Sequence, residues 1–262
     1  MQRPLATMGL ILALLSGTSL AQDKPVFVEE MTWQEVRQAI QDGATTAIFY
    51  AGSTEQNGPH MVTGKHNVVA RFVAERIARQ LGNALVYPIL PFAPTGDPVR
   101  KTDHMAYPGS VSVSESTYGA IASDVSRSAR AAGFKNIVLM GDHGGGQESL
   151  GVVARQLTAE WASDGTRVFH IADLYYRSLE LAEAELQVQG LKDGSHAGII
   201  DTSELMFLDK DGRLVRAAKI AAGTLDSGAS GDSRLATKSL GQRFIQFKID
   251  SAVAQIQQLI SR

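Results

Sequence analysis

Histidines in predicted loops are the residues of this sequence whose types and positions could support chemistry. The chain has six histidines and no cysteine, and five of the histidines lie in loops or at the starts of predicted helices: His60, His66, His104, His143 and His196. The sixth, His170, falls inside a predicted strand, where a hydrogen-bonded core histidine is the favoured interpretation. Because cysteine thiolates are excluded, any metal ion must be bound by imidazole, carboxylate or neutral oxygen ligands.

Four loop segments combine these side chains with small residues. They are GSTEQNGPHMVTGKHN (52–67), TDHMAYPGS (102–110), GDHGGGQES (141–149) and DGSHAGIIDTSE (193–204). Glycine lets the backbone turn tightly and lets a ligand approach closely. A metallohydrolase needs such loops, since three or four ligands must converge on one cation. Histidines at turns also brace loops through hydrogen bonds, and we favour this structural alternative for His60 and His104.

Three other catalytic motifs are incomplete or missing. The segment from Gly58 to Lys65 resembles a phosphate-binding loop, but five residues separate Gly58 from Gly64 where four are required. The position that should hold a magnesium-binding Ser or Thr is His66. The sequence has neither a Gly-x-Ser-x-Gly nucleophile motif nor a Gly-x-Gly-x-x-Gly dinucleotide motif after a strand. These absences argue against a nucleotide-binding protein and against a serine hydrolase of the usual kind.

The elements that must position the loops alternate between helix and strand, which predicts an α/β fold with a mainly parallel sheet. Helices are expected over 33–41, 68–81, 114–132, 147–162, 174–188 and from about 234 to the C-terminus, with a possible break at Gly241. Strands are expected over 46–51, 84–90, 111–113, 136–140 and 168–172. In such sheets the functional loops follow the carboxyl ends of the strands. The loops at 52–64 and 141–146 each follow a predicted core strand directly.

The composition and the N-terminal segment limit the classes of protein to which this chain can belong. The chain has 262 residues, a net charge of −2 and 44% apolar residues, as in a globular protein without the basic field of a general nucleic-acid binder. Residues 1–21 have a basic start, an apolar stretch and a small-x-small end, which predicts a cleaved signal peptide rather than a membrane anchor. We therefore expect residues 22–262 to form one exported domain, in a bacterial periplasm, with no membrane span.

The four loop segments together resemble the creatininase (creatinine amidohydrolase) family. The matching segments are Gly52-Ser53-Thr54-Glu55-Gln56-Asn57-Gly58-Pro59-His60, Tyr107-Pro108-Gly109-Ser110, Gly141-Asp142-His143-Gly144-Gly145 and His196-Ala197-Gly198 with Asp201-Thr202-Ser203. The resemblance implies a three-layer α/β/α sandwich, assembly into homo-oligomers, often hexamers, and metal-dependent cleavage of cyclic or linear amide bonds. It also implies a pair of divalent ions, commonly zinc or manganese.

The resemblance also assigns roles to individual residues. Glu55 and His143 match two metal ligands of the family, and His196 matches a histidine implicated as a proton carrier. Asp201 stands where the family has a glutamate. Two departures matter: a ligand histidine is replaced by Asn57, and the aspartate that bridges the two ions is replaced by His66. A neutral imidazole has one free lone pair and cannot bridge two cations as a carboxylate does.

A site with one ion is therefore the favoured hypothesis, with Glu55, His66 and His143 as ligands to zinc, or else manganese. Asp201 is expected to act as a base, as a fourth ligand or as a partner of a ligand histidine, and His196 as the proton carrier. The expected function is hydrolysis of a small, possibly cyclic, amide through a metal-activated water. The alternative is an inactive relative that binds a small ligand or partner. A rebuilt two-ion site using His60, Asp103 or His104 is a third option.

Overall fold

The computed structural model describes residues 24–261 and contains one parallel sheet. Its strands are β1 (Thr46–Ala51), β2 (Ala84–Val86), β3 (Asn136–Gly141) and β4 (Arg167–His170), in the order β2-β1-β3-β4. The two central strands pair in register from Thr46 with Asn136 to Ala51 with Gly141. Because they end together, the loops that follow β1 and β3 start side by side.

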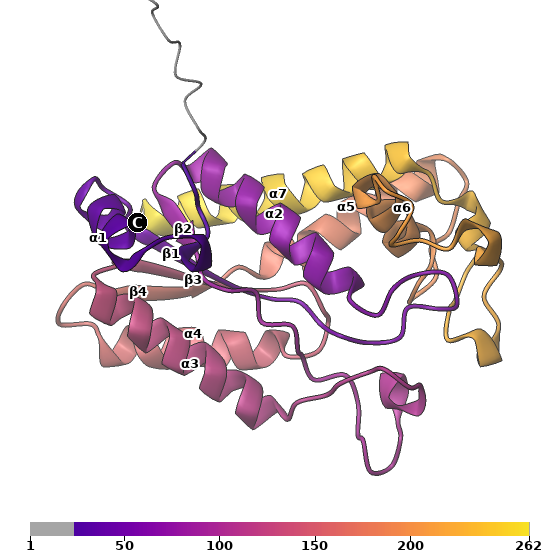
Figure 1. The fold of residues 1–262 in the computed structure, drawn as a ribbon, viewed down its shortest axis with the longest axis horizontal. Coiled ribbons are helices and arrows are strands. Elements are labelled where there is room, and N and C mark those ends of the chain that lie inside the picture. The colour runs from indigo at the N-terminus through magenta and orange to yellow at the C-terminus, as the bar shows by residue number, and fades with distance from the viewer. Residues whose placement is uncertain (1–23, 262) are drawn as a thin grey trace, which may run out of the picture.

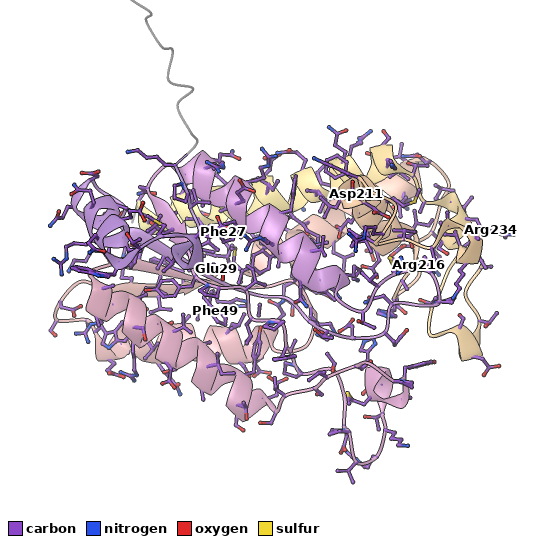
Figure 2. All side chains as sticks on the ribbon, in the orientation of Figure 1. Phe27, Glu29, Phe49, Asp211, Arg216 and Arg234 are labelled. Atoms are coloured by element: carbon purple, nitrogen blue, oxygen red, sulfur yellow. The ribbon has the colours of Figure 1, made fainter. Side chains whose placement is uncertain are left out.

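Helices cover both faces of this sheet (Figure 1). They are α1 (Trp33–Gln41), α2 (Lys65–Leu81), α3 (Glu115–Ala132), α4 (Gln147–Glu160), α5 (Tyr176–Val188), α6 (Ile199–Leu208) and α7 (Lys238–Ile260). Alternate residues of β1 point to opposite faces, as a strand requires. Ile48 and Tyr50 pack with α2 and α7, whereas Phe49 packs with α3 and α4. Figure 2 shows Phe49 on the side of the sheet that faces α3. The expected three-layer α/β/α sandwich is confirmed.

Most expected elements occur within a few residues of their expected bounds. The helix at 33–41 and the strand at 46–51 match the expectation at both ends, and Thr32 caps the former with a capping box. The prediction of a strand at 111–113 is wrong, because Val111 and Ser112 form only isolated bridges, with Thr54 and Ala93 respectively. Their partners lie in irregular loops, which offer no continuous strand to pair with.

The C-terminal third differs more from expectation. Helix α6 was not expected, and α7 begins at Lys238 and continues through Gly241 without the possible break. A side chain at Gly241 would place its Cβ 1.8 Å from the carbonyl oxygen of Ser203 in α6. Glycine at this position therefore permits a close approach of α6 and α7, which explains a glycine inside a long helix.

None of the helices within residues 24–261 combines the length and apolar character needed to cross a bilayer. The predicted signal peptide, residues 1–21, lies outside the described residues.

Candidate active site

The loop after β1 carries Glu55, whose side chain is fully buried and receives several hydrogen bonds. The hydroxyl of Ser53 donates to Oε2 at 2.6 Å. Nε2 of His143 lies 3.0 Å from the same oxygen, and Nε2 of His66 lies 3.1 Å from Oε1. The structure thus brings together the three residues predicted as ligands, with the imidazoles of His66 and His143 on different oxygens of Glu55.

His66, at the start of α2, joins Glu55 to a second buried carboxylate. Its Nδ1 lies 2.7 Å from Oδ2 of Asp142, while its Nε2 faces Glu55. Both ring nitrogens therefore act as donors, which is the hydrogen-bonding pattern of an imidazolium. Burial and the nearby Lys65 ammonium oppose the charge, but the two carboxylates outweigh them and raise the pKa of His66 to about 9. In this state the ring has no free lone pair for a metal ion.

His143 follows β3 in the glycine-rich loop 141–146. The backbone N–H of Gly145 donates to its Nδ1 at 2.9 Å. A neutral His143 therefore carries its proton on Nε2 and donates it to Glu55. A Cβ on Gly145 would lie 2.1 Å from the carbonyl oxygen of Pro94, so the loop requires glycine there. This arrangement holds His143 as a donor to Glu55 rather than as a ring with a lone pair toward the cavity.

His104 and His196 complete a group with Glu55 that has the spacing of metal ligands. One ligand atom from each of the three residues lies within 4.8 Å of the others, the one such group found among residues 24–261. Nε2 of His104 lies 3.7 Å from Oε1 of Glu55, and the side-chain amide of Gln56 contacts its Nδ1 at 3.2 Å. The oxygen of this amide accepts from the backbone N–H of Gly58 at 3.0 Å, so its nitrogen faces Nδ1 and a neutral His104 carries its proton on Nε2, as His143 does. Binding of a metal ion at Nε2 of His104 would require the Gln56 amide to turn over.

His196 lies just before α6, and its two ring nitrogens have different partners. Nε2 donates to the carbonyl oxygen of Gln56 at 2.8 Å, so the lone pair of the neutral ring is on Nδ1. Burial, reinforced by the positive charge of Lys65, lowers the pKa of His196 to about 4, and burial also lowers the pKa of His104. Both rings are neutral at pH 7. Two neutral imidazoles and a carboxylate fit one divalent ion with an open position for water.

The buried Lys65 pairs with Asp201, the carboxylate that the sequence predicted to act as a base. Nζ of Lys65, whose side chain is 2% exposed, lies 2.6 Å from Oδ1 of Asp201. The backbone N–H of Ala197 donates to the other oxygen at 2.8 Å. Against the effect of burial, Lys65 holds the pKa of Asp201 well below its usual range. These contacts favour a role for Asp201 in holding the Lys65 ammonium in place. The assignment of Asp201 as a base stays a prediction.

A second lysine, on α7, neutralises Asp142. Nζ of Lys248 lies 3.1 Å from Oδ1 of Asp142, and the hydroxyl of Tyr50 donates to the same oxygen at 3.0 Å. With His66 on Oδ2, this carboxylate has three donors. The same lysine lies 3.6 Å from Oε1 of Glu204 on α6. Lys248 reaches the site because it is seven residues, or two helical turns, beyond Gly241, where α6 and α7 approach each other.

A second divalent ion does not fit the residues that are present. The buried amide of Asn57 donates to the backbone oxygen of Glu55 at 2.9 Å, and Asn57 is not among the residues that line the cavity. The carboxylates of Asp142 and Asp201 already have cationic partners at hydrogen-bond distance. Another cation would have to displace a buried ammonium or imidazolium.

These side chains surround a cavity of about 360 Å³. One wall is charged, and the other is formed by α5 and the start of α6 with Tyr175, Leu179, Ala182 and Ile200. A cavity of this size suits a small molecule rather than a folded chain.

The other histidines have structural contacts. His60 is 1% exposed and lies 2.8 Å from the hydroxyl of Thr202, in keeping with the loop-bracing interpretation. His170 lies 2.9 Å from the side-chain oxygen of Gln147, which confirms the core interpretation. Sequence reasoning missed Lys65, Lys248 and Glu204. Lys65 stands beside His66 in the loop, which is a weak signal, and nothing in the helical pattern distinguishes the other two.

Comparison with known proteins shows which family the chain belongs to. The sequence model of the creatininase family, described as creatinine amidohydrolase, matches residues 29–256, so the chain belongs to the creatininase family. A creatinine amidohydrolase from Pseudomonas putida is 26% identical over 197 residues, which cover 72% of this chain and 74% of that protein. A mycofactocin precursor peptide peptidase from Mycolicibacterium smegmatis is 25% identical over 228 residues, covering 78% and 81%.

Solved structures share the fold. A crystal structure of creatinine amidohydrolase superposes with a TM-score of 0.72 at 22% identity, over 90% of this chain and 98% of that chain. Creatininase has also been solved in a manganese form and, as a variant, in a form described as Zn-Zn type. Members of the family are hydrolases acting on amide bonds, and homologues bind divalent metals.

Proposed function

We propose that this protein is a metal-dependent hydrolase that cleaves the amide C–N bond of a small, possibly cyclic, molecule. The observation that carries the proposal is the group of Glu55, His104 and His196, whose ligand atoms lie within 4.8 Å of one another beside the cavity. Membership of a family of amide hydrolases supports the reaction type. Two imidazoles and a carboxylate suit zinc, and manganese is the second choice.

Bound there, a divalent ion would supply a water of lowered pKa and would polarise the scissile carbonyl. The residues of the chain prepare the site for that chemistry. Ser53, His66 and His143 fix both oxygens of Glu55 through hydrogen bonds. Lys65 lines the cavity and has one hydrogen bond, to Asp201, so two of its three N–H donors are left to stabilise negative charge on the substrate oxygen.

We propose one ion rather than two. Lys65, Lys248 and the protonated His66 contribute three positive charges next to Glu55, Asp142 and Asp201. Each of these three carboxylates thereby has a cationic partner without a second metal ion, and charges removed from water need such compensation. This pairing also favours the second candidate function, a metal-free relative that binds a small ligand in the cavity without turning it over.

Metal content tests the ligand set. Purified protein loaded with zinc or manganese and then desalted should retain one ion per chain by elemental analysis. His104→Ala and His196→Ala should each lose it, while His66→Gln and His143→Gln should keep most of it. The reverse pattern would support the set predicted from the sequence instead. Failure of the unsubstituted protein to retain metal, together with no turnover of a panel of amides and lactams, would favour the metal-free binder.

Export to a periplasm and assembly into a homo-oligomer, a hexamer by analogy with the family, are also proposed. The pattern of residues 1–21 supports export. N-terminal sequencing of protein secreted from a bacterial host should give a start near residue 22. Light scattering after size-exclusion chromatography measures the assembly, and a monomer at micromolar concentration would contradict the proposal.

A further inference from the structure

Gln56 lies between the two histidines of the proposed ligand group and contacts both of them. Its backbone oxygen accepts a hydrogen bond from Nε2 of His196 at 2.8 Å, and its side-chain amide lies 3.2 Å from Nδ1 of His104. Its backbone N–H donates to the hydroxyl of Ser110 at 3.0 Å. Both backbone groups of Gln56 therefore have fixed partners, and the side-chain amide is the part of this residue that can turn.

The backbone of Gly58 sets the orientation of that amide. The N–H of Gly58 donates to Oε1 of Gln56 at 3.0 Å, so the amide nitrogen donates to Nδ1 of His104. A neutral ring that accepts at Nδ1 carries its proton on Nε2, which lies 3.7 Å from Oε1 of Glu55. In this arrangement the nitrogen of His104 that faces Glu55 has no lone pair for a metal ion.

A half-turn of the amide reverses the assignment of the ring nitrogens. Oε1 would then accept a hydrogen bond from Nδ1 of His104, which leaves the lone pair of the neutral ring on Nε2. The net charge is unchanged, because one proton leaves Nε2 for solvent and another from solvent binds Nδ1 of the same ring. The N–H of Gly58 would lose its acceptor and face the amide NH2 instead, and this loss opposes the turn.

The same amide is covered by the segment around residue 228. A Cβ added at Gly228 would lie 2.4 Å from Oε1 of Gln56, so the two residues are in close contact. The amide is therefore held between Gly58 and His104 and packed against a third part of the chain. It keeps its present orientation until a further interaction stabilises the other one.

We propose that Gln56 is a positioning residue that determines which nitrogen of His104 is available to a divalent ion. The present orientation of the amide stabilises the metal-free site, and ion binding requires the amide to turn. His196 needs no such change, because its Nε2 donates to a backbone oxygen and its lone pair is already on Nδ1. The apparent affinity for the ion is therefore lower than the ligands alone would give. The inference rests on the proposed ligand set of Glu55, His104 and His196.

The position of the His104 proton tests the inference without any metal ion. Long-range proton–nitrogen correlation NMR of the metal-free protein distinguishes protonated from unprotonated ring nitrogens, and His104→Ala identifies the signals. At about pH 8.5, where the ring is neutral, the unsubstituted protein should carry the proton on Nε2. Gln56→Glu has two acceptor oxygens, one for Gly58 and one for His104, so the proton should move to Nδ1. Gln56→Met, which has neither donor nor acceptor, should give a mixture of the two forms and serves if the glutamate is poorly tolerated.

Zinc affinity, measured by competition with a chelator of known affinity, tests the consequence for binding. Gln56→Glu should bind zinc at least about tenfold more tightly than the unsubstituted protein, because no hydrogen bond then opposes the required ring form. Ser195→Asp is the control for the added charge, since Ser195 is an exposed residue of the same cavity and the amide is kept. It should change the affinity by less than about threefold. A purely structural role of Gln56 predicts weaker binding in Gln56→Glu, as is usual when a group that holds a ligand histidine is replaced.

Two NMR results would overturn the inference: a proton on Nδ1 of His104 in the unsubstituted metal-free protein, or a proton that stays on Nε2 in Gln56→Glu. If the protein binds zinc, equal or weaker binding in Gln56→Glu would overturn it as well. The proposed hydrolase fails on different measurements, namely metal content and amide turnover. A protein that retains no zinc and hydrolyses no amide, but shows the expected shift of the His104 proton, would keep the role of Gln56 and lose the enzyme.

Discussion

Removing one partner of the ion pair between Lys65 and Asp201 should cost far more stability than removing one partner of a surface pair of equal length. At 2.6 Å the direct attraction is about 6 kcal/mol for an effective dielectric constant near 20. The cost of removing both charges from water offsets most of this attraction, so the net value of the pair is small. Replacing only Lys65 leaves the Asp201 charge with the Ala197 N–H as its sole donor. Because Asp201 remains 24% exposed and can recruit water, we expect a loss of about 3 kcal/mol, at the lower end for a buried pair.

The measurements are urea unfolding and thermal unfolding of Lys65→Met, a variant in which the side chain keeps its length. The midpoint of thermal unfolding should fall by about 6–12 °C. Adding Asp201→Asn to Lys65→Met should recover about 2 kcal/mol, since the stranded charge is removed. Arg127→Met is the control, because Arg127 pairs with Glu160 at the same 2.6 Å but both side chains are about half exposed. It should cost less than about 1 kcal/mol. A loss below about 1 kcal/mol in Lys65→Met, or no recovery in the double variant, would refute the reasoning.

Three further predictions concern stability and its pH dependence. Gly241→Ala should destabilise the protein by about 3 kcal/mol or more, measured by urea unfolding, because its Cβ would lie 1.8 Å from the oxygen of Ser203; a loss under about 1 kcal/mol would contradict that close approach. Thr32→Ala, which removes the capping box with Glu35, should cost about 1 kcal/mol in the same assay, and an unchanged midpoint would argue against the cap. Burial raises the pKa of Glu204 from 4.5 to about 7, so the folded state binds this proton more tightly than the unfolded state does. The stabilisation that this proton provides is complete below pH 4.5 and is lost as the pH rises to about 7. Between about pH 4.5 and 7, the free energy of unfolding of Glu204→Gln should therefore rise relative to that of the unsubstituted protein, measured by urea unfolding at several pH values. A difference in free energy that does not change with pH would contradict this prediction.

Local signals predicted most of the fold. The helix at 33–41 has a Thr cap with Glu three positions later, and the strand at 46–51 is a continuous apolar run between a helix and a glycine, so both were predicted at their bounds. Helix α6 was missed because it is short and begins with two β-branched isoleucines, which have a lower helix propensity. Its formation depends on packing against α7, which the local pattern does not contain.

The place of the site could be predicted in outline, since Glu55 and four of the five loop histidines line one cavity. The contacts within it could not be predicted. Lys65 pairs with a carboxylate 136 residues away, and Lys248 with one 106 residues away. A lysine in a helix is usually exposed, so sequence alone favours a solvated side chain for each. The roles of the histidines depend on which ring nitrogen carries the proton, and that is decided by partners such as the backbone of Gly145.

The link formed by His66 between Glu55 and Asp142 has a consequence for how this site could change over generations. His66→Asp alone would place a third negative group against two buried carboxylates and remove the cation between them. Such a step would lower stability before any second ion had ligands to bind, since Asn57 would still lack a charged ligand group. Several changes would have to arrive together. No single substitution at position 66 would therefore create a two-ion site, because it would first leave two buried carboxylates without the cation that now joins them.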